Sequence, residues 1–274
     1  MGRVIQTLPE GEPVFGVTSL ENHLYVLRGE KLLVQVEVYD VDSSGLLHCL
    51  TVPGLMYGRE IIACEYNRCA YISDPSLKSI HRVELPGPEA VVTRWPVHDL
   101  PSNLSISVRH GVLVACPEVR KIKEFSTDGQ LLQTVDLSQD VVTPWHTIQL
   151  CSGEYIVCHG APADRLHRVC LIGSDGQVVK SYGGLKGSGS QRMNTPVRLA
   201  VDRNGFVFVV DMNNRRVLLL SPALTYIREV VTREQLNWDP LRVHLDVDTQ
   251  RLYVADNEYK RGDWRVGRVI VVSV

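Results

Sequence analysis

Residues 201–221 read VDRNGFVFVVDMNNRRVLLLS, and this stretch decides the fold. The apolar run Phe206–Val210 is followed by Asp211 and a short polar turn, and a second apolar run begins after Arg216. Runs of β-branched and aromatic residues bounded by Asn, Asp and Gly are typical of strands joined by a tight turn. The stretch therefore predicts a β-hairpin whose turn carries Asp211, Asn214 and Arg216.

The apolar anchor of this hairpin recurs along the whole chain. It reads LYVLR at 24–28, AYISD at 70–74, VLVAC at 112–116, EYIVC at 154–158, VFVVD at 207–211 and LYVAD at 252–256. Counted from Tyr25 to Tyr253, successive anchors lie 46, 42, 42, 53 and 45 residues apart. Short strand-like runs precede and follow each anchor, and Asp-Gly turns at 128–129 and 175–176 introduce a fourth. A repeat of this length with four strands in each unit is typical of a β-propeller.

The sequence thus predicts a single all-β domain, a six-bladed β-propeller with four-stranded blades. The expected blades span residues 12–55, 56–98, 99–141, 142–184, 194–232 and 238–274. The last of these units runs out at its third strand, whereas residues 2–8 (GRVIQTL) have the length and pattern of one extra strand. We expect residues 2–8 to pair beside the C-terminal strand and complete the sixth blade, because a closed ring leaves no sheet edge exposed.

Composition and cysteine usage limit the class of protein. The chain has 274 residues, a formal net charge of −2 and no apolar run long enough for a membrane helix. The near-neutral charge gives no general argument for a polyanionic partner. The seven cysteines form no CxxC pair and several lie in apolar strand-like runs. This pattern favours buried thiols in a reducing compartment, so we expect a cytoplasmic protein without a membrane partner.

The hairpin motif resembles a known repeat. Residues 201–221 resemble an NHL repeat, in which an apolar strand is followed by Asp, a short turn with Asn, and Arg before the next strand. ADNEYKRGDWRVGRVIVVS (255–273) is similar with a longer turn and keeps Asp256 and Arg268. YISDPSLKSIHRV (71–83) keeps Asp74 but has Ser79 where Arg is expected, and the third unit has Cys116 and Lys121.

The residue types of this motif have a structural explanation. We expect Asp211 to accept hydrogen bonds from the amides of its turn and to pair with Arg216, which would fix the hairpin. Asn214, Asp256 and Arg268 are given the same structural role. The resemblance to NHL propellers, such as the C-terminal propeller of tripartite-motif NHL proteins, implies an interaction module. In those proteins the propeller recruits RNA or proteins to a ubiquitin ligase or a translational repression complex.

A binding site is predicted on one face of the ring. The turns between second and third strands share that face with the links that enter the inner strands, and the blades themselves are scaffold. This face is expected to be locally basic, although Glu118, Asp164, Glu258 and Asp263 dilute its charge. The candidates at the inner-strand starts are Arg59, Glu60, Asn103, Trp145, His146, Arg198 and Arg242. The candidates in the turns are Lys78, Arg120, Lys121, Arg215, Tyr259, Lys260 and Arg261.

Three functions remain open at this stage. A non-catalytic module that binds a protein partner is preferred, and single-stranded RNA bound through the basic face is the alternative. Trp145 could either stack on a ligand or pack as a wedge between blades. The third possibility is a metal-dependent hydrolase or lyase, for which Glu60, Asn103 and His146 could converge on a cation. Arg198 and Arg242 at equivalent positions would repel that cation, so the sequence predicts no catalytic residue, no metal, no cofactor and no DNA partner.

Overall fold

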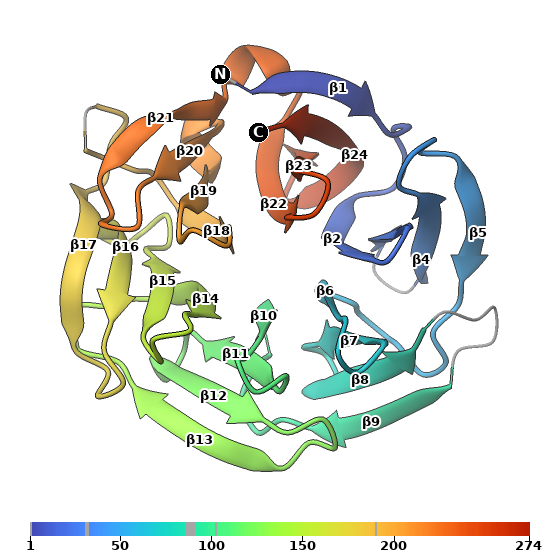
Figure 1. Ribbon diagram of the computed structural model, residues 1–274, viewed down its shortest axis with the longest axis horizontal. Helices are drawn as coiled ribbons and strands as arrows, with labels where there is room; N and C mark the ends of the chain where they lie inside the picture. Colours follow the sequence, from blue (N-terminus) through green and yellow to red (C-terminus); the bar gives the residue numbers. More distant parts are fainter. Residues whose placement is uncertain (1, 31–32, 86–90, 102, 190) are drawn as a thin grey trace.

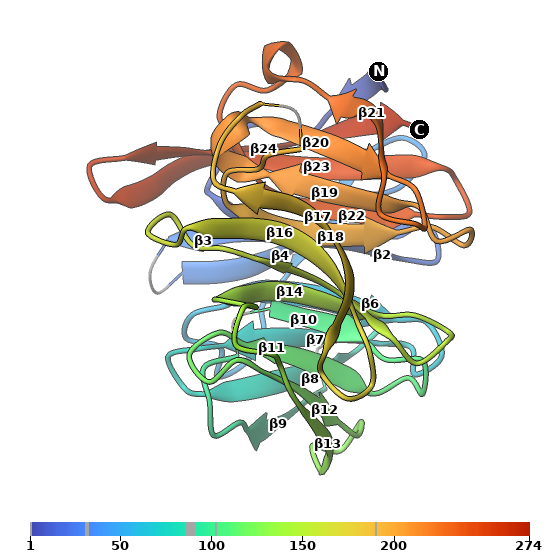
Figure 2. The ribbon, with the colours of Figure 1, turned by 90° about the vertical axis from the view of Figure 1, so that its left-hand side faces the viewer.

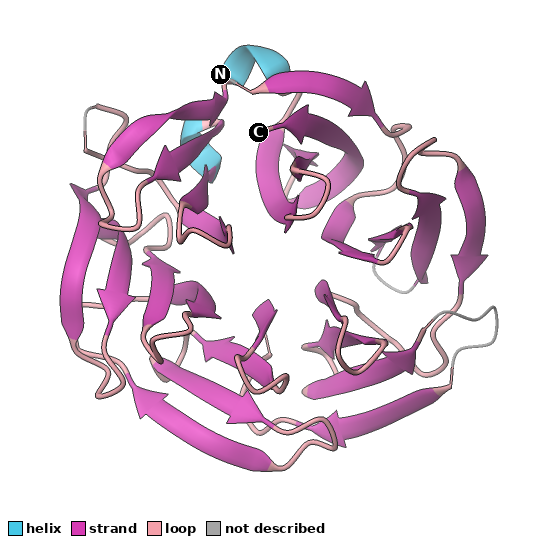
Figure 3. Cartoon of the chain, in the orientation of Figure 1, coloured by secondary structure: helices cyan, strands magenta, loops and turns pink. Residues whose placement is uncertain are grey.

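The structure is a computed structural model that describes residues 2–30, 33–85, 91–101, 103–189 and 191–274. It is a closed ring of six four-stranded antiparallel sheets, as predicted. Figure 1 shows the ring down its axis, and Figure 3 shows that strands make up nearly all of its regular structure. The two described helices, η1 (Met212–Asn214) and η2 (Arg233–Gln235), are single 3-10 turns. Neither has the length or hydropathy that crossing a membrane requires.

The first three blades follow one another in chain order, with the inner strand first. Blade I consists of β2 (Val14–Leu20), β3 (His23–Glu30), β4 (Leu33–Asp40) and β5 (Leu46–Leu50). Blade II consists of β6 (Glu60–Cys64), β7 (Cys69–Asp74), β8 (Ser79–Glu84) and β9 (Val92–Pro96). Blade III consists of β10 (Asn103–Ile106), β11 (Val112–Cys116), β12 (Lys121–Phe125) and β13 (Leu131–Asp136).

The second half of the ring repeats this order and ends in the closure. Blade IV consists of β14 (Pro144–Gln149), β15 (Tyr155–His159), β16 (Leu166–Ile172) and β17 (Val178–Leu185). Blade V consists of β18 (Pro196–Val201), β19 (Val207–Asp211), β20 (Arg216–Leu220) and β21 (Tyr226–Val231). Blade VI consists of β22 (Asp239–Asp246), β23 (Arg251–Lys260), β24 (Asp263–Ser273) and the N-terminal β1 (Arg3–Thr7).

The closure by the N-terminal strand is confirmed. β1 pairs antiparallel with β24, with Arg3 opposite Ser273 and Thr7 opposite Ile270. The backbone of Gly2 also donates to the carbonyl of Val230 in blade V, so the N-terminus joins the fifth blade to the sixth. Both termini lie at this seam in Figure 1. The outer edge of the last blade is therefore covered by the first strand of the chain.

The hydrophobic core lies between blades. The buried apolar residues form six clusters, and each cluster combines side chains from two neighbouring blades. The second strand of each blade is covered on both faces, which explains why β19 (VFVVD) is buried at every position instead of alternating. Because every blade packs against two others, the ring holds its inner strands in a fixed arrangement around the axis.

Candidate functional site

We call the side of the ring that carries the turns between second and third strands the upper face. On this face, the Asp211 carboxylate is fully buried. It accepts hydrogen bonds from the Asn194 amide at 2.7 Å, from Asn214 Nδ2 at 2.8 Å and from Arg216 Nε at 2.8 Å. From the sequence we expected the amide donor to belong to the turn itself. The structure places it instead in the link that enters blade V, so Asp211 joins the turn to that link.

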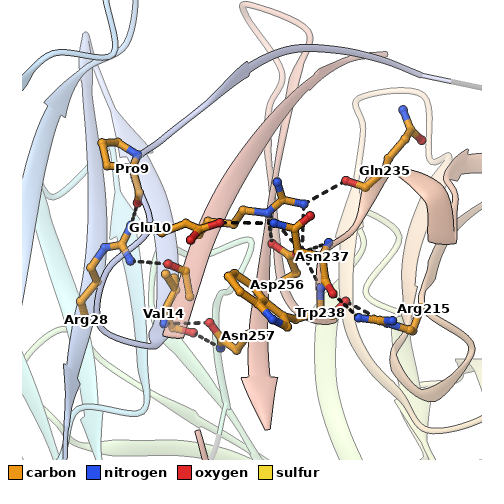
Figure 4. Close-up of polar contacts among 12 residues, drawn as sticks. Pro9, Glu10, Val14, Arg28, Arg215, Gln235, Asn237, Trp238, Asp256 and Asn257 are labelled. Carbon is orange, nitrogen blue, oxygen red and sulfur yellow. Dashed lines mark hydrogen bonds and ion pairs between the residues drawn. The ribbon is translucent and has the colours of Figure 1, made fainter. Parts of the chain in front are cut away.

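Blades II and VI use an aspartate in the same way. Asp256 accepts from the amides of Asn237 and Trp238, at 2.7 and 3.0 Å (Figure 4). It also accepts from Arg268 Nε at 3.0 Å. Asp74 accepts from the Met56 amide at 2.7 Å. In both cases the amides belong to the link that enters the blade. We call this arrangement the link clamp.

Blades I and IV carry a link clamp of different chemistry, which the sequence did not reveal. Arg28 occupies the strand position of Asp211 and is nearly fully buried. Its guanidinium donates to the Pro9 carbonyl in the link at 2.9 Å (Figure 4). It also donates to the Glu12 carbonyl at 2.8 Å. In blade IV, His159 Nδ1 lies 3.1 Å from the Val142 carbonyl. A donor replaces the acceptor in these blades because the link presents a carbonyl instead of an amide.

The clamp of blade VI gives a testable prediction. We expect Asp256→Ala to lower the free energy of unfolding by about 3 kcal/mol or more, because it leaves Arg268 without its buried partner and two amides without an acceptor. Urea unfolding at neutral pH measures the change. Asp248→Ala removes an aspartate whose side chain is 69% exposed and should change stability by less than about 1 kcal/mol. Equal effects of the two substitutions would contradict the clamp.

Six equivalent positions near the upper end of the inner strands form what we call the channel ring. Strand register defines these positions. Arg198, for example, pairs with Val210, the residue before Asp211 on the second strand, and the other five residues hold the same register position in their own blades. The members of the channel ring are Gly16, Glu60, Asn103, His146, Arg198 and Arg242. A Cβ on Gly16 would lie 2.6 Å from the Ile61 backbone nitrogen, so this position requires glycine where blades I and II approach. The other five are among the seven candidates that the sequence placed at the inner-strand starts, and Arg59 and Trp145 lie outside the channel ring.

Side chains of the channel ring bind across blade boundaries. Asn103 Nδ2 donates to the Trp145 carbonyl of the next blade, and His146 Nε2 lies 3.1 Å from the Leu104 carbonyl. Arg242 donates from Nε to the Phe15 carbonyl and from Nη2 to the Arg59 carbonyl at 2.9 Å. These contacts link blades III with IV and VI with I and II.

One ion pair crosses the channel itself. Arg198 of blade V pairs with Glu60 of blade II, and these blades lie on opposite sides of the ring (Figure 1). Arg242 Nε lies 3.7 Å from the same Glu60 carboxylate. Glu60, Arg198 and Arg242 are each at most 4% exposed. The channel ring therefore places its charges inside the channel, out of direct reach of a macromolecule on the upper face.

Burial changes the protonation of these groups. It lowers the pKa of His146 to about 4, so the imidazole of His146 is neutral at physiological pH. Burial, together with the charge of Arg59, lowers the pKa of Arg242 to about 9. Burial and the charges of Arg242 and Arg59 hold the pKa of Arg198 well below its ordinary value. Positive charge in the channel is thus only partly compensated by Glu60.

The sequence suggested that Glu60, Asn103 and His146 could converge on a cation, but in the structure each of these side chains has another partner. Glu60 faces Arg198, while Asn103 and His146 bind backbone carbonyls of neighbouring blades. Within the described ranges, no three His, Cys, Asp or Glu side chains are placed to hold a metal ion. The seven cysteines are all unpaired thiols, and five of them are buried.

The remaining candidates divide into structural and exposed residues. Trp145 packs between blades IV and V and donates from Nε1 to the Gly160 carbonyl at 3.3 Å, which is the wedge alternative. Arg215 donates to the carbonyl of Trp238 at 3.1 Å, and Lys121 pairs with Asp136 at 3.0 Å. Arg59 is half-buried. The residues exposed on the upper face are Lys78, Arg120, Tyr259, Lys260 and Arg261.

Apolar residues join these exposed residues, and sequence analysis missed them. Met56, in the link to blade II, is 45% exposed, and Leu77, in the β7–β8 turn, is 38% exposed. Trp264 lies 4.9 Å from Tyr259, measured between ring centroids, and packs against the apolar cluster of blades I and II. A single apolar residue in a loop carries no sequence signal, because exposed apolar side chains are common. These apolar residues are related to the exposed candidates only because the fold places all of them on the upper face.

Comparisons with known proteins identify the fold alone. No protein-family model matches the chain, and no curated protein sequence matches it. Among solved structures, it is similar to the PQQ-bound aldose sugar dehydrogenase of Streptomyces coelicolor, with a TM-score of 0.67 and 14% identity over 99% of this chain and 98% of that one. It is also similar to the virginiamycin B lyase of Staphylococcus aureus, with a TM-score of 0.62 and 8% identity over 97% and 98%.

A third similar structure comes from a complex between proteins. A chain of the nidogen/laminin complex has a TM-score of 0.61 and 12% identity over 81% of both chains. The similar structures thus include enzymes and a member of a protein complex. Function must therefore be argued from the surface of this chain and not from its fold.

Proposed function

We propose that this chain is a non-catalytic interaction module that binds a protein partner through its upper face. The β23–β24 hairpin carries the proposal. Its strands have 10 and 11 residues, and Figure 2 shows the hairpin projecting beyond the neighbouring turns of the ring. A blade can be completed by shorter strands, so the length of this hairpin, which ends in Tyr259, Lys260 and Arg261, suggests a role beyond the fold.

We call the exposed residues from this hairpin to blade II the upper rim: Met56, Leu77, Lys78, Tyr259, Lys260 and Arg261. Tyr259 is 57% exposed even though its ring contacts the ring of Trp264. Trp264 packs against the apolar cluster of blades I and II, and Tyr57 next to Met56 contacts Phe15 of blade I, with ring centroids 5.9 Å apart. The upper rim therefore has its members on blades VI and II, on either side of blade I.

The chemistry of the upper rim indicates the kind of partner. Tyrosine and methionine are enriched in protein interfaces, and an apolar centre edged by charge is typical of such surfaces. Lys78, Lys260 and Arg261 supply three cations, of which Lys260 lies 4.0 Å from the Glu258 carboxylate. We therefore propose a partner segment that inserts an apolar or aromatic side chain and carries flanking carboxylates.

Two likenesses support this proposal. The nidogen/laminin structure is, by its description, a complex between proteins. The NHL-like turn motif, with Asp211–Arg216 and Asp256–Arg268, points toward propellers that act by recruiting other molecules. RNA binding is the competing outcome, but two arginines that would have served it, Arg198 and Arg242, are buried in the channel.

A selected peptide tests the proposal. Peptides of about fifteen residues that bind the chain would be selected from a display library, and their affinity measured by fluorescence anisotropy. We expect selected sequences with an apolar residue flanked by Asp or Glu. Tyr259→Ala should weaken binding by at least about tenfold, as expected for an interface anchor worth more than about 1.4 kcal/mol.

Tyr66→Ala is the matched control. Tyr66 is 74% exposed and lies in the β6–β7 turn of the opposite face, where it stacks on His110. We expect this variant to bind like the unchanged chain. Loss of affinity in Tyr66→Ala but not in Tyr259→Ala would contradict the upper-rim proposal. Tight binding of a single-stranded RNA pool with steep salt dependence, in place of any peptide, would favour the RNA alternative.

A further inference from the structure

A cavity of about 230 Å³ lies on the ring axis below the channel ring, and residues of all six inner strands line it. Glu60, His146 and Arg198 form its upper end. The walls below are mainly apolar, with Ile62, Ile148 and Val243 among them. The lining continues to Val201, at the lower end of β18. The cavity is smaller than the sites that hold drug-sized ligands, so it suits a ligand of few atoms.

The Arg198 guanidinium is not fully satisfied at the top of this cavity. Its side chain is 2% exposed and its Nη2 pairs with Glu60. Its Nη1 is buried and has no hydrogen-bond partner in the part of the chain that the structure describes. Buried polar groups are nearly always paired, and a buried charged donor without an acceptor is costly. Arg198 is therefore a positioned donor that lacks an acceptor.

The charged groups around Arg198 also carry a net positive charge. Glu60 contributes one negative charge, whereas Arg198 and Arg242 contribute two positive charges within this buried site. The half-buried Arg59 adds a third positive charge nearby. Arg242 uses its three nitrogens on the carbonyls of Phe15, Leu241 and Arg59, so its role is structural. At least one positive charge is left over, and Arg198 is the group that lines the cavity with a donor available.

We propose that this cavity binds a small aliphatic monocarboxylate, with its carboxylate on Arg198 and its hydrocarbon tail between the apolar walls. A negative charge matches the surplus, and a planar carboxylate matches the geometry of a guanidinium. Phosphate fits less well, because the wall beside Ile62, Ile148 and Val243 offers few donors for its additional oxygens, and the Ser105 hydroxyl already donates to the Thr147 carbonyl. Since the channel ring closes the upper end, the ligand enters from the lower end. This site is independent of the upper rim.

Sodium butyrate is the probe, and butyramide is its neutral counterpart of similar shape. Thermal unfolding at constant ionic strength should show a saturable rise of the Tm with butyrate, because a ligand that binds only the folded state stabilises it. Butyramide should give no rise, since it lacks the charge. Calorimetric titration then gives the Kd. Equal responses to butyrate and butyramide, or none to either, would overturn the proposal.

Two variants locate the site. Ala200→Val narrows the cavity wall without touching the charged groups, and we expect it to weaken butyrate binding at least tenfold. Glu60→Gln/Arg198→Met replaces both members of the ion pair, which is tolerated better than loss of one, and it should abolish binding. If this double variant does not fold, Ala200→Val decides alone. Unchanged butyrate affinity in Ala200→Val would contradict binding in the cavity.

Discussion

Deletion of residues 1–8 is expected to remove at least about 5 kcal/mol of the stability of the propeller, a large part of the 5–15 kcal/mol typical of folded proteins. The deletion takes away β1, which covers the edge of β24, and Leu8, which is 1% exposed. Burial of a leucine alone is worth about 2 to 3 kcal/mol. The hydrogen bonds that join Gly2 to Val230 and to Gln235 in the neighbouring blade are lost as well.

Thermal unfolding of the truncated and full chains measures this effect. We expect the Tm to fall by roughly 10–20 °C, since each kcal/mol shifts the Tm of a chain of this size by about 2–4 °C. A circular permutant is the matched control. Arg3 lies opposite Ser273, so a short loop can join Val274 to Gly2, with new termini opened at Gly54, where a Cβ would meet nothing within 4 Å. The permutant keeps β1 in place and should retain the Tm of the full chain.

The comparison of the truncated chain with the permutant isolates the contribution of the β1 strand. An unchanged Tm after deletion of residues 1–8 would contradict closure by β1. A permutant that is as unstable as the deletion would show that the position of the chain ends, and not the missing strand, sets the stability.

Acidification is expected to destabilise the ring well above the range in which carboxylates titrate. Burial lowers the pKa of His146, His159 and His244 from 6.5 to about 4. Burial also lowers the pKa of His81. A group with a depressed pKa in the folded state stays neutral there while the unfolded chain takes up a proton. The stabilisation is therefore fully present above pH 6.5 and is lost as the pH falls toward 4.

The size of the effect follows from the three histidines with a pKa near 4. Each contributes a slope of up to about 1.4 kcal/mol per pH unit, so the free energy of unfolding should fall by about 7 kcal/mol between pH 6.5 and about 4.5. Urea unfolding at a series of pH values measures the slope. His159→Gln should reduce the slope by about a third, because it removes one of the three protons taken up.

His48→Gln is the control for this experiment. His48 lies exposed on β5, and its replacement should leave the slope unchanged. A free energy of unfolding that stays constant from pH 7 to about 4.5 would contradict the proposed neutral state of the buried histidines.

The sequence predicted the fold because its main signal is local and repeated. The anchors around Tyr25, Tyr71 and Phe208 recur at blade spacing, and each became a buried second strand. The closure by residues 2–8 could be predicted because the last blade lacked a strand. Asp211 and Asp256 could be assigned to turns because Asp followed by a nearby Arg is a recognisable local pattern.

The link clamps of blades I and IV could not be predicted in this way. Arg28 and His159 have different chemistry from aspartate, and only strand register shows that they occupy its position. The same limit applies to the channel. Glu60 and Arg198 belong to blades far apart in sequence, and nothing local shows that they meet across the ring axis. The sequence analysis therefore expected the inner-strand candidates to be accessible at the mouth of the channel. The structure instead buries five of them within the channel: Glu60, Asn103, His146, Arg198 and Arg242.

The predicted basic face is reduced in the structure to the exposed turn residues, and apolar neighbours give it a different character. Met56 and Leu77 belong to blade II, while Tyr259 belongs to blade VI. Their common face follows from the ring and not from their spacing in the sequence. This combination of apolar and cationic side chains is the basis for proposing a protein partner.

Hydrogen exchange of the chain with and without a selected peptide tests the central claim most directly. We predict that the peptide slows amide exchange in the β23–β24 hairpin and in the link 51–59, while the turn at 65–68 on the opposite face exchanges as before. Slowed exchange confined to the turn at 65–68 and its neighbours on that face would contradict binding through the upper rim.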